Sequence, residues 1–136
     1  MILIMGLPNS GKTTYSMQYE NVIHLDDYSK SKFKKCNEVV KNTDGNVVVE
    51  GIYNSEIRRK ELLDVVKDKK CRNVCIWLDT STEECLRREN LYRCRGDHIV
   101  KKNARLFDEP TLSEGWDEIM IIRGDDVEVV RKDDVK

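Results

Sequence analysis

Five short runs rich in Val and Ile, separated by stretches of helical character, constrain the fold of this chain most. The runs are Ile2–Met5, Asn21–Leu25, Asn46–Glu50, Asn73–Asp79 and Glu118–Arg123. The central runs are almost continuously apolar, which is typical of strands buried on both faces of a parallel sheet. Repeated strand–helix–strand units predict a doubly wound α/β fold.

The stretches between these runs carry the signals of helices. Residues Asn54–Asp68 and Asp97–Phe107 place apolar side chains at helical spacing, and Thr82–Cys94 follows a capping signal at Ser81. A last run, Val127–Arg131, comes after a turn signal and is predicted to pair antiparallel with the run before it. We therefore expect one three-layer domain over residues 1–136, with a mostly parallel central sheet, helices on both faces and a C-terminal antiparallel edge strand.

Charge and cysteine content exclude several classes of protein. The chain has 24 Lys and Arg against 25 Asp and Glu, so it is neither a uniformly basic nucleic-acid coat nor an acidic tail. No apolar run approaches the ~20 residues of a membrane helix, and the apolar start is too short for a signal peptide. Five cysteines without a Cys-x-x-Cys pair, and two histidines, argue against a disulfide framework or a zinc site. A reducing, cytoplasmic setting is the natural expectation.

The most specific motif is Gly6-Leu-Pro-Asn-Ser-Gly-Lys-Thr13, a complete G-x-x-x-x-G-K-[ST] sequence. It follows a predicted strand and opens a predicted helix, Lys12–Tyr19, which is the context that a phosphate-binding loop requires. Glycines let backbone N–H groups wrap an anion, Lys12 reaches the outer phosphates, and the Thr13 hydroxyl suits Mg²⁺. The motif predicts ATP or GTP with Mg²⁺, bound by residues that include Gly6, Asn9, Ser10, Gly11, Lys12, Thr13 and Thr14.

Carboxylates follow the second and third runs, at the edge of the sheet where ligands bind in parallel α/β folds. Asp26 directly follows a strand, and we expect it to act as the base that takes a proton from an acceptor hydroxyl. Asp27 is a candidate for acceptor binding, although a helix cap is its more ordinary role. Glu50 is a candidate for the Mg²⁺ shell or for acceptor contact, the alternative being a carboxylate satisfied by nearby backbone.

A basic stretch lies between residues 87 and 105, where seven Lys and Arg stand against two acids. It predicts a helical lid that turns at Gly96 and closes guanidinium groups over a moving phosphoryl group. The bland alternative for each arginine is a solvated helix face. A second basic patch, Lys30 to Lys35, is equally suited to guiding a phosphate backbone or to serving as a soluble surface.

Taken in order, these motifs resemble the 5′-hydroxyl polynucleotide kinase branch of the P-loop kinases. The resemblance rests on the phosphate loop, Asp26-Asp27-Tyr28, Arg88-x-Asn90-x-x-Arg93 and the stretch Pro110-Thr111-x-x-Glu114-Gly115-Trp116. It covers nearly the whole chain and is similar to the kinase half of bifunctional kinase-phosphatases. The resemblance implies transfer of the ATP γ-phosphate to a 5′-hydroxyl end of DNA or RNA.

The resemblance also assigns roles to residues. It makes Lys12 a phosphate ligand, Asp26 the general base, and Arg88 and Arg93 the lid arginines, with Arg95 able to replace Arg93. Family members often carry an arginine after the Asp-Asp pair, where this chain has Ser29, so Arg58 or Arg59 becomes the candidate for acceptor contact. Two alternatives stay open: a P-loop kinase of a nucleoside, nucleotide or other small hydroxyl compound, and a non-catalytic or hydrolytic nucleotide switch.

Overall fold

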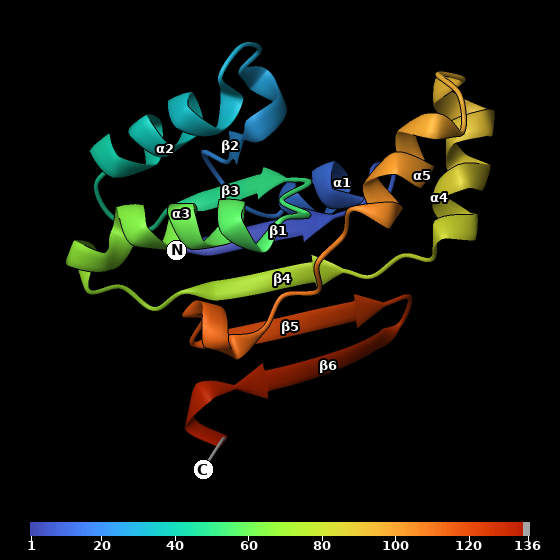
Figure 1. Cartoon of the computed structure of the whole chain (residues 1–136). Helices are drawn as coiled ribbons and strands as arrows, with labels where there is room; N and C mark the ends of the chain where they lie inside the picture. The colour runs from blue at the N-terminus through green and yellow to red at the C-terminus, as the bar shows by residue number, and fades with distance from the viewer. Residues whose placement is uncertain (135–136) are drawn as a thin grey trace.

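The computed structural model describes residues 1–134, which form one six-stranded sheet (Figure 1). The strands lie in the order β2-β3-β1-β4-β5-β6. Their bounds are β1 Ile2–Gly6, β2 Ile23–His24, β3 Val48–Gly51, β4 Val74–Leu78, β5 Glu118–Arg123 and β6 Asp126–Arg131. All neighbouring strands run parallel except β5 and β6, which are antiparallel. This confirms the predicted α/β fold, with its mostly parallel sheet and antiparallel edge.

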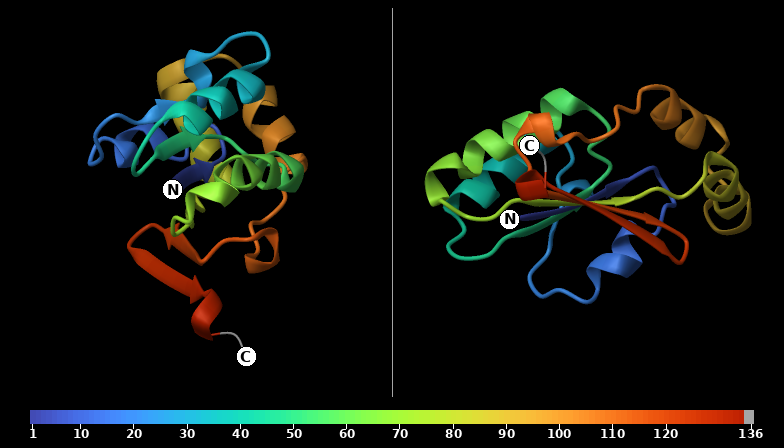
Figure 2. Two further views of the ribbon diagram at one scale, coloured as in Figure 1. Left: turned by 90° about the vertical axis from the view of Figure 1, so that its left-hand side faces the viewer. Right: turned by 90° about the horizontal axis from the view of Figure 1, so that it is seen from below.

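Five α-helices surround the sheet unevenly. Their bounds are α1 Lys12–Ser16, α2 Lys32–Asn42, α3 Glu56–Val66, α4 Thr82–Arg88 and α5 His98–Arg105. Helices α2 and α3 lie side by side on one face of the sheet, α1 lies on the other, and α4 and α5 stand together beyond one end of the strands (Figures 1 and 2). Within residues 1–134 no helix combines the length and the apolar character that a membrane crossing needs.

Alternation along β1 explains how the sheet holds its two layers of helices. Leu3 and Met5 are fully buried on the side that α2 and α3 cover, in the larger core cluster. Ile4, between them, points to the opposite face and packs with Ile76 and Tyr15. Side chains alternate across a strand, so a continuously apolar strand must be covered on both sides.

The region after β2 differs from the prediction. The strand predicted at Asn21–Leu25 is only two residues long, because Leu25–Asp27 turn into a 3-10 helix. Asp27 lies inside this turn, so it does not cap a helix. The N-cap of α2 is Ser31, which lies four residues after Asp27 and has a left-handed backbone (φ 56°).

A buried ion pair accounts for the stretch Pro110–Trp116 before β5. Arg59 is fully buried in α3 and donates from Nε and Nη2 to the two carboxylate oxygens of Glu114, both at 2.8 Å. The Nε1–H of Trp116 donates to the same carboxylate at 3.0 Å, and Trp116 is itself fully buried. Arg59 therefore contributes to the core and is excluded as an acceptor contact. Separating its buried guanidinium from the Glu114 carboxylate would leave two buried, unpaired charges, which is strongly unfavourable.

Candidate active site

The phosphate loop (residues 6–13) connects the end of β1 to α1 and takes its shape from backbone geometry. Asn9 and Gly11 both have positive φ angles, 70° and 101°, in the region that glycine tolerates best. A side chain at Gly6 would place its Cβ 2.8 Å from the carbonyl oxygen of Leu78, so only glycine fits there. The hydroxyl of Ser10 is buried without a hydrogen-bond partner among residues 1–134. An orphaned buried donor beside a loop of this shape fits a ligand rich in acceptor oxygens.

Lys12 lies at the bottom of the site, 8% exposed, with its Nζ donating to the carbonyl oxygen of Leu7 at 2.7 Å. Burial lowers the pKa of Lys12 from its ordinary 10.5 to about 8, while the nearby charges of Glu50 and Asp26 act in the opposite direction. The ammonium has therefore lost most of its hydration, and the two nearby carboxylates offset only part of that loss. Such a group gains more from an incoming phosphate than a solvated lysine would.

Two carboxylates reach the same site from neighbouring strands. Glu50, at the end of β3, is almost fully buried and its Oε2 lies 2.9 Å from Nδ1 of His24. Asp26 follows β2, its side chain is 75% exposed, and its Oδ1 lies 3.8 Å from Nζ of Lys32. The buried carboxylate is held in place by a neighbour, whereas the exposed one is available to an incoming molecule.

The lid (residues 87–105) is built from α4, a π-helical turn over Glu89–Arg93 and α5. The side chain of Ser81 accepts from the backbone N–H of Glu84, as the capping signal predicted. Arg88 donates from Nη1 to the carbonyl oxygen of Asn9 at 2.8 Å, which ties the lid to the phosphate loop. The chain reverses at Gly96 (φ 114°) before α5 begins.

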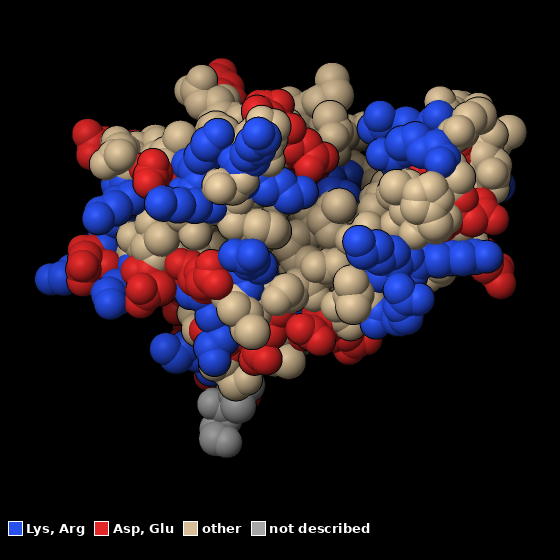
Figure 3. Space-filling model, turned by 45° about the horizontal axis from the view of Figure 1, so that its top comes forward, with Lys and Arg blue, Asp and Glu red and all other residues tan. Residues whose placement is uncertain are grey.

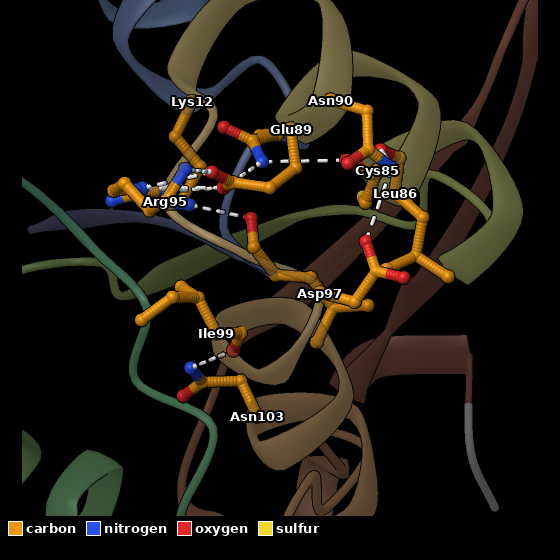
Figure 4. Close-up of polar contacts among 11 residues, drawn as sticks. Lys12, Cys85, Leu86, Glu89, Asn90, Arg95, Asp97, Ile99 and Asn103 are labelled. Atoms are coloured by element: carbon orange, nitrogen blue, oxygen red, sulfur yellow. Dashed lines mark hydrogen bonds and ion pairs between the residues drawn. The ribbon is translucent and has the colours of Figure 1, made fainter.

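The three lid arginines with predicted roles, Arg88, Arg93 and Arg95, differ in how they are held. Arg88 is half-buried and pairs with Glu84 as well as with the loop. Arg95 pairs closely with Glu89, and the two side chains point toward each other (Figure 4). Arg93 is exposed and forms no ion pair with any residue between 1 and 134.

These elements enclose one cavity of about 1010 Å³. The predicted residues that line it are Asn9, Ser10, Gly11, Lys12, Thr13, Thr14, Asp26, Glu50, Arg88, Arg93 and Arg95. On one face of the molecule, Lys and Arg side chains stand on both sides of a central, mostly uncharged area (Figure 3). The structure thus brings most of the predicted site together around a space large enough for a nucleotide.

Three predicted residues lie outside the lining. Gly6 sits beneath the loop at the end of β1, where its role is steric. Asp27 is exposed in the 3-10 turn. Arg58 projects from α3, with its guanidinium carbon 4.4 Å from the ring centroid of Phe33 and Nη1 3.4 Å from Glu61.

Other lining residues had no site role predicted from the sequence. They are Tyr28, Ile52, Tyr92 and Ile99, whereas Lys32, which also lines the cavity, belongs to the basic patch predicted at Lys30 to Lys35. Tyr92 is 75% exposed on the lid, and an aromatic residue among arginines is the sequence signal that could have identified it. His24 also lies against Glu50 at the edge of the site.

The donor set fits Mg²⁺ better than a tightly chelated metal. Among residues 1–134 no group of three or more His, Cys, Asp and Glu side chains could hold a metal ion. Mg²⁺ ordinarily takes one or two protein oxygens and completes its shell with water and phosphate oxygens. The exposed Thr13 hydroxyl and the Glu50 carboxylate line the same cavity and match that requirement.

Comparisons with known proteins were informative at the level of structure. No family model and no curated protein sequence matches this chain. Kti12 from Chaetomium thermophilum, solved in complex with ADP-AlF3, matches with a TM-score of 0.67 and 18% identity, over 92% of this chain and 89% of that one. A gluconokinase from Sinorhizobium meliloti 1021 matches with a TM-score of 0.65 and 12% identity, over 92% and 82%.

A third match points the same way. The APS kinase CysC of Mycobacterium tuberculosis, in complex with AMPPNP and APS, has a TM-score of 0.65 and 17% identity, over 92% of this chain and 88% of that one. This chain has the P-loop kinase fold. At sequence identities below 20%, these matches show a shared fold and say nothing about the substrate. The resemblance to polynucleotide kinases therefore rests on the sequence motifs alone.

Proposed function

We propose that this protein is an ATP-dependent kinase that transfers the γ-phosphoryl group to a hydroxyl group. One observation carries the proposal: a single cavity is lined by the buried Lys12, the lid arginines Arg88 and Arg93, and the exposed carboxylate of Asp26. A nucleotide switch needs only the loop and the metal shell. A kinase also needs a base facing the acceptor, and the exposed carboxylate of Asp26 in the same cavity supports that role.

In this proposal each group has one task. Lys12 and the loop N–H groups hold the outer phosphates, and the guanidinium groups stabilise the negative charge of the transferring phosphoryl group. Asp26 accepts the proton of the acceptor hydroxyl. At the same time the hydroxyl oxygen bonds to the γ-phosphorus, and the bond between that phosphorus and the ADP oxygen breaks. Thr13 and Glu50 are the residues that would hold Mg²⁺, which when bound offsets phosphate charge.

For the acceptor, we propose a 5′-hydroxyl end of DNA or RNA. The ordered motifs of the sequence support it, and so does the exposure of the acceptor side, where Asp26 is 75% exposed beside Lys32. Lys30, Lys34 and Lys35 are also exposed, within nine residues of Asp26 in the sequence, and add positive charge that would attract a phosphate backbone. A small hydroxyl compound is the second candidate, because two of the matched structures are a gluconokinase and an APS kinase.

The test is a labelling experiment. The protein is incubated with γ-labelled ATP and Mg²⁺ and offered 5′-hydroxyl DNA, 5′-hydroxyl RNA, nucleosides, 3′-nucleotides and sugar acids. Label on an oligonucleotide 5′ end supports the full proposal. Label only on a small compound retains the kinase and replaces the acceptor, while ATP hydrolysis with no labelled acceptor would contradict the kinase itself.

A further inference from the structure

Glu89 is a fully buried carboxylate inside the most basic part of the chain. It begins the π-helical turn of the lid, and its two oxygens are both occupied. Oε1 accepts from Asn9 Nδ2 at 2.9 Å and from Arg95 Nη2 at 2.6 Å. Oε2 accepts from the backbone N–H of Arg95 at 2.8 Å. One side chain thus joins the phosphate loop to the far end of the lid turn.

The local backbone explains how Arg95 reaches Glu89. The wide π-helical turn ends at Cys94, whose N–H donates to the carbonyl oxygen of Glu89 and whose left-handed φ of 55° then turns the chain. Arg95 consequently folds back over the residue six positions earlier (Figure 4). Single π-helical turns are rare and are frequently found at functional sites.

The charges around Glu89 decide which arginine is free to act. Hydrogen bonds from the Arg95 side chain hold the pKa of Glu89 down at about 2, so its carboxylate is charged at neutral pH. The charge of Arg95 is largely taken up by this partner. Arg93 has no such partner among residues 1–134, lines the cavity, and lies near enough to Lys12 to lower the pKa of its ammonium.

We propose that Glu89 is a positioning residue: it fastens the lid to the phosphate loop through Arg95 and Asn9, and thereby presents Arg93 to the transferring phosphoryl group. The proposal rests on the kinase function proposed above and deepens it. Arg95 is then part of the fastening, and Arg93 is the lid arginine that contacts the phosphoryl group together with Arg88. A buried acid near a triphosphate site is otherwise unfavourable, because two anions would share a poorly solvated space.

The test measures how much more tightly the protein binds ADP–aluminium fluoride, a mimic of the transition state, than ADP. Arg93 acts on the charge of the moving phosphoryl group, so Glu89→Gln should reduce this preference about tenfold or more while ADP affinity changes little. Glu83→Gln changes an exposed acid of α4 and is the matched control. A partly misfolded sample lowers the binding amplitude and leaves the ratio of dissociation constants unchanged, so the readout separates positioning from stability.

Two further variants complete the design. Arg93→Gln should lose the preference as well, and adding Glu89→Gln to it should cost little more, because Glu89 acts through Arg93. If Glu89→Gln folds poorly, Glu89→Leu with Arg95→Leu replaces both members of the ion pair, leaves no unpaired buried charge and should fold while showing the same loss. A wild-type preference in Glu89→Gln or in the double leucine variant would overturn the proposal.

Failure of the kinase function gives a different result. A wild-type protein that binds neither ADP nor the mimic contradicts the proposed function. The fastening is then tested by hydrogen exchange, in which Glu89→Gln should speed exchange in both residues 6–13 and residues 89–97, and Glu83→Gln in neither. Loosening of the lid alone would contradict the connection that Glu89 is proposed to make.

Discussion

The two halves of the candidate site are built in opposite ways. The donor side (residues 6–13 and the lid) is fastened by buried groups: Lys12 is 8% exposed and Arg88 is bonded to a loop carbonyl. The acceptor side (residues 24–35) presents Asp26 with 75% of its side chain exposed and one loose ion pair, at 3.8 Å, to Lys32. Short hydrogen bonds within the chain hold the donor side, whereas the one ion pair of Asp26 on the acceptor side is long.

The largest effect is expected from the buried lysine of the donor side. Lys12→Met removes the cation beneath the outer phosphates, and phosphoryl transfer should fall by more than about a thousandfold. Initial rates with γ-labelled ATP, together with ATP binding by calorimetry, check this. A Lys12→Met variant with near-normal turnover would remove the donor side from the site altogether.

The next effect separates the two aspartates of the acceptor side. Asp26→Asn should keep ATP affinity and reduce transfer by about a hundredfold or more, because the acceptor hydroxyl loses its base. Asp27→Asn, one residue further in the same turn and outside the cavity lining, should change transfer by less than about threefold. Equal and large losses in the two variants would show that the base has been assigned to the wrong residue.

The pH dependence of ATP binding distinguishes the two sides further. Lys12 must be protonated to bind phosphate, and its pKa in the free protein is about 8. ATP affinity should therefore fall as pH rises through 8, approaching about tenfold per pH unit, and Lys12→Met should show no such fall. Titration calorimetry between pH 7 and 9.5 measures this.

The same pKa has the opposite consequence for stability without nucleotide. Folding buries a charged ammonium below pH 8, and the unfolded chain keeps its proton up to about 10.5. The unfolded state binds more protons between these values, so the free energy of unfolding should rise over that range, by on the order of 1–3 kcal/mol. Denaturant unfolding at pH 7.5 and 9.5, with Lys12→Met as the flat control, tests the sign.

The smallest effect belongs to the rim of the acceptor side. Lys32→Gln should raise the KM for a 5′-hydroxyl oligonucleotide by a factor of about two to five and leave the KM for ATP unchanged. Added salt should raise the same KM steeply in the wild type, because a polyanion releases counterions when it binds. A KM that is flat in salt and indifferent to Lys32 would favour a small acceptor.

The sequence predicted the local structure of residues 6–13 better than that of the segment after β2, for a physical reason. The phosphate loop is specified by local backbone requirements, such as the close approach at Gly6, and a short motif records them. The bounds predicted for β5 match those observed, because a short apolar run in the sequence marks the whole strand. Helix α2 was missed because its buried positions, Cys36 and Val40, are sparse among lysines.

Pairings between distant residues were beyond reach of the sequence. The sequence makes Arg59 a candidate for acceptor contact. Nothing in its neighbouring residues indicates that its guanidinium pairs with Glu114, 55 positions later. Glu89 was counted only as an acid that reduces the charge of the lid. The structure shows that it also joins two segments that lie 80 positions apart.

Both ends of the lid are secured outside the cavity. At its start Thr80 donates to the carbonyl oxygen of Ser10 at 2.8 Å, and after its end the backbone N–H of Asp108 donates to Asn54 at 2.8 Å while Phe107 stacks on Trp77. Exposed side chains between these contacts, such as Tyr92, can therefore be substituted without unfolding the domain. Substitutions at exposed lid positions can therefore reshape the wall of the cavity while the scaffold stays the same.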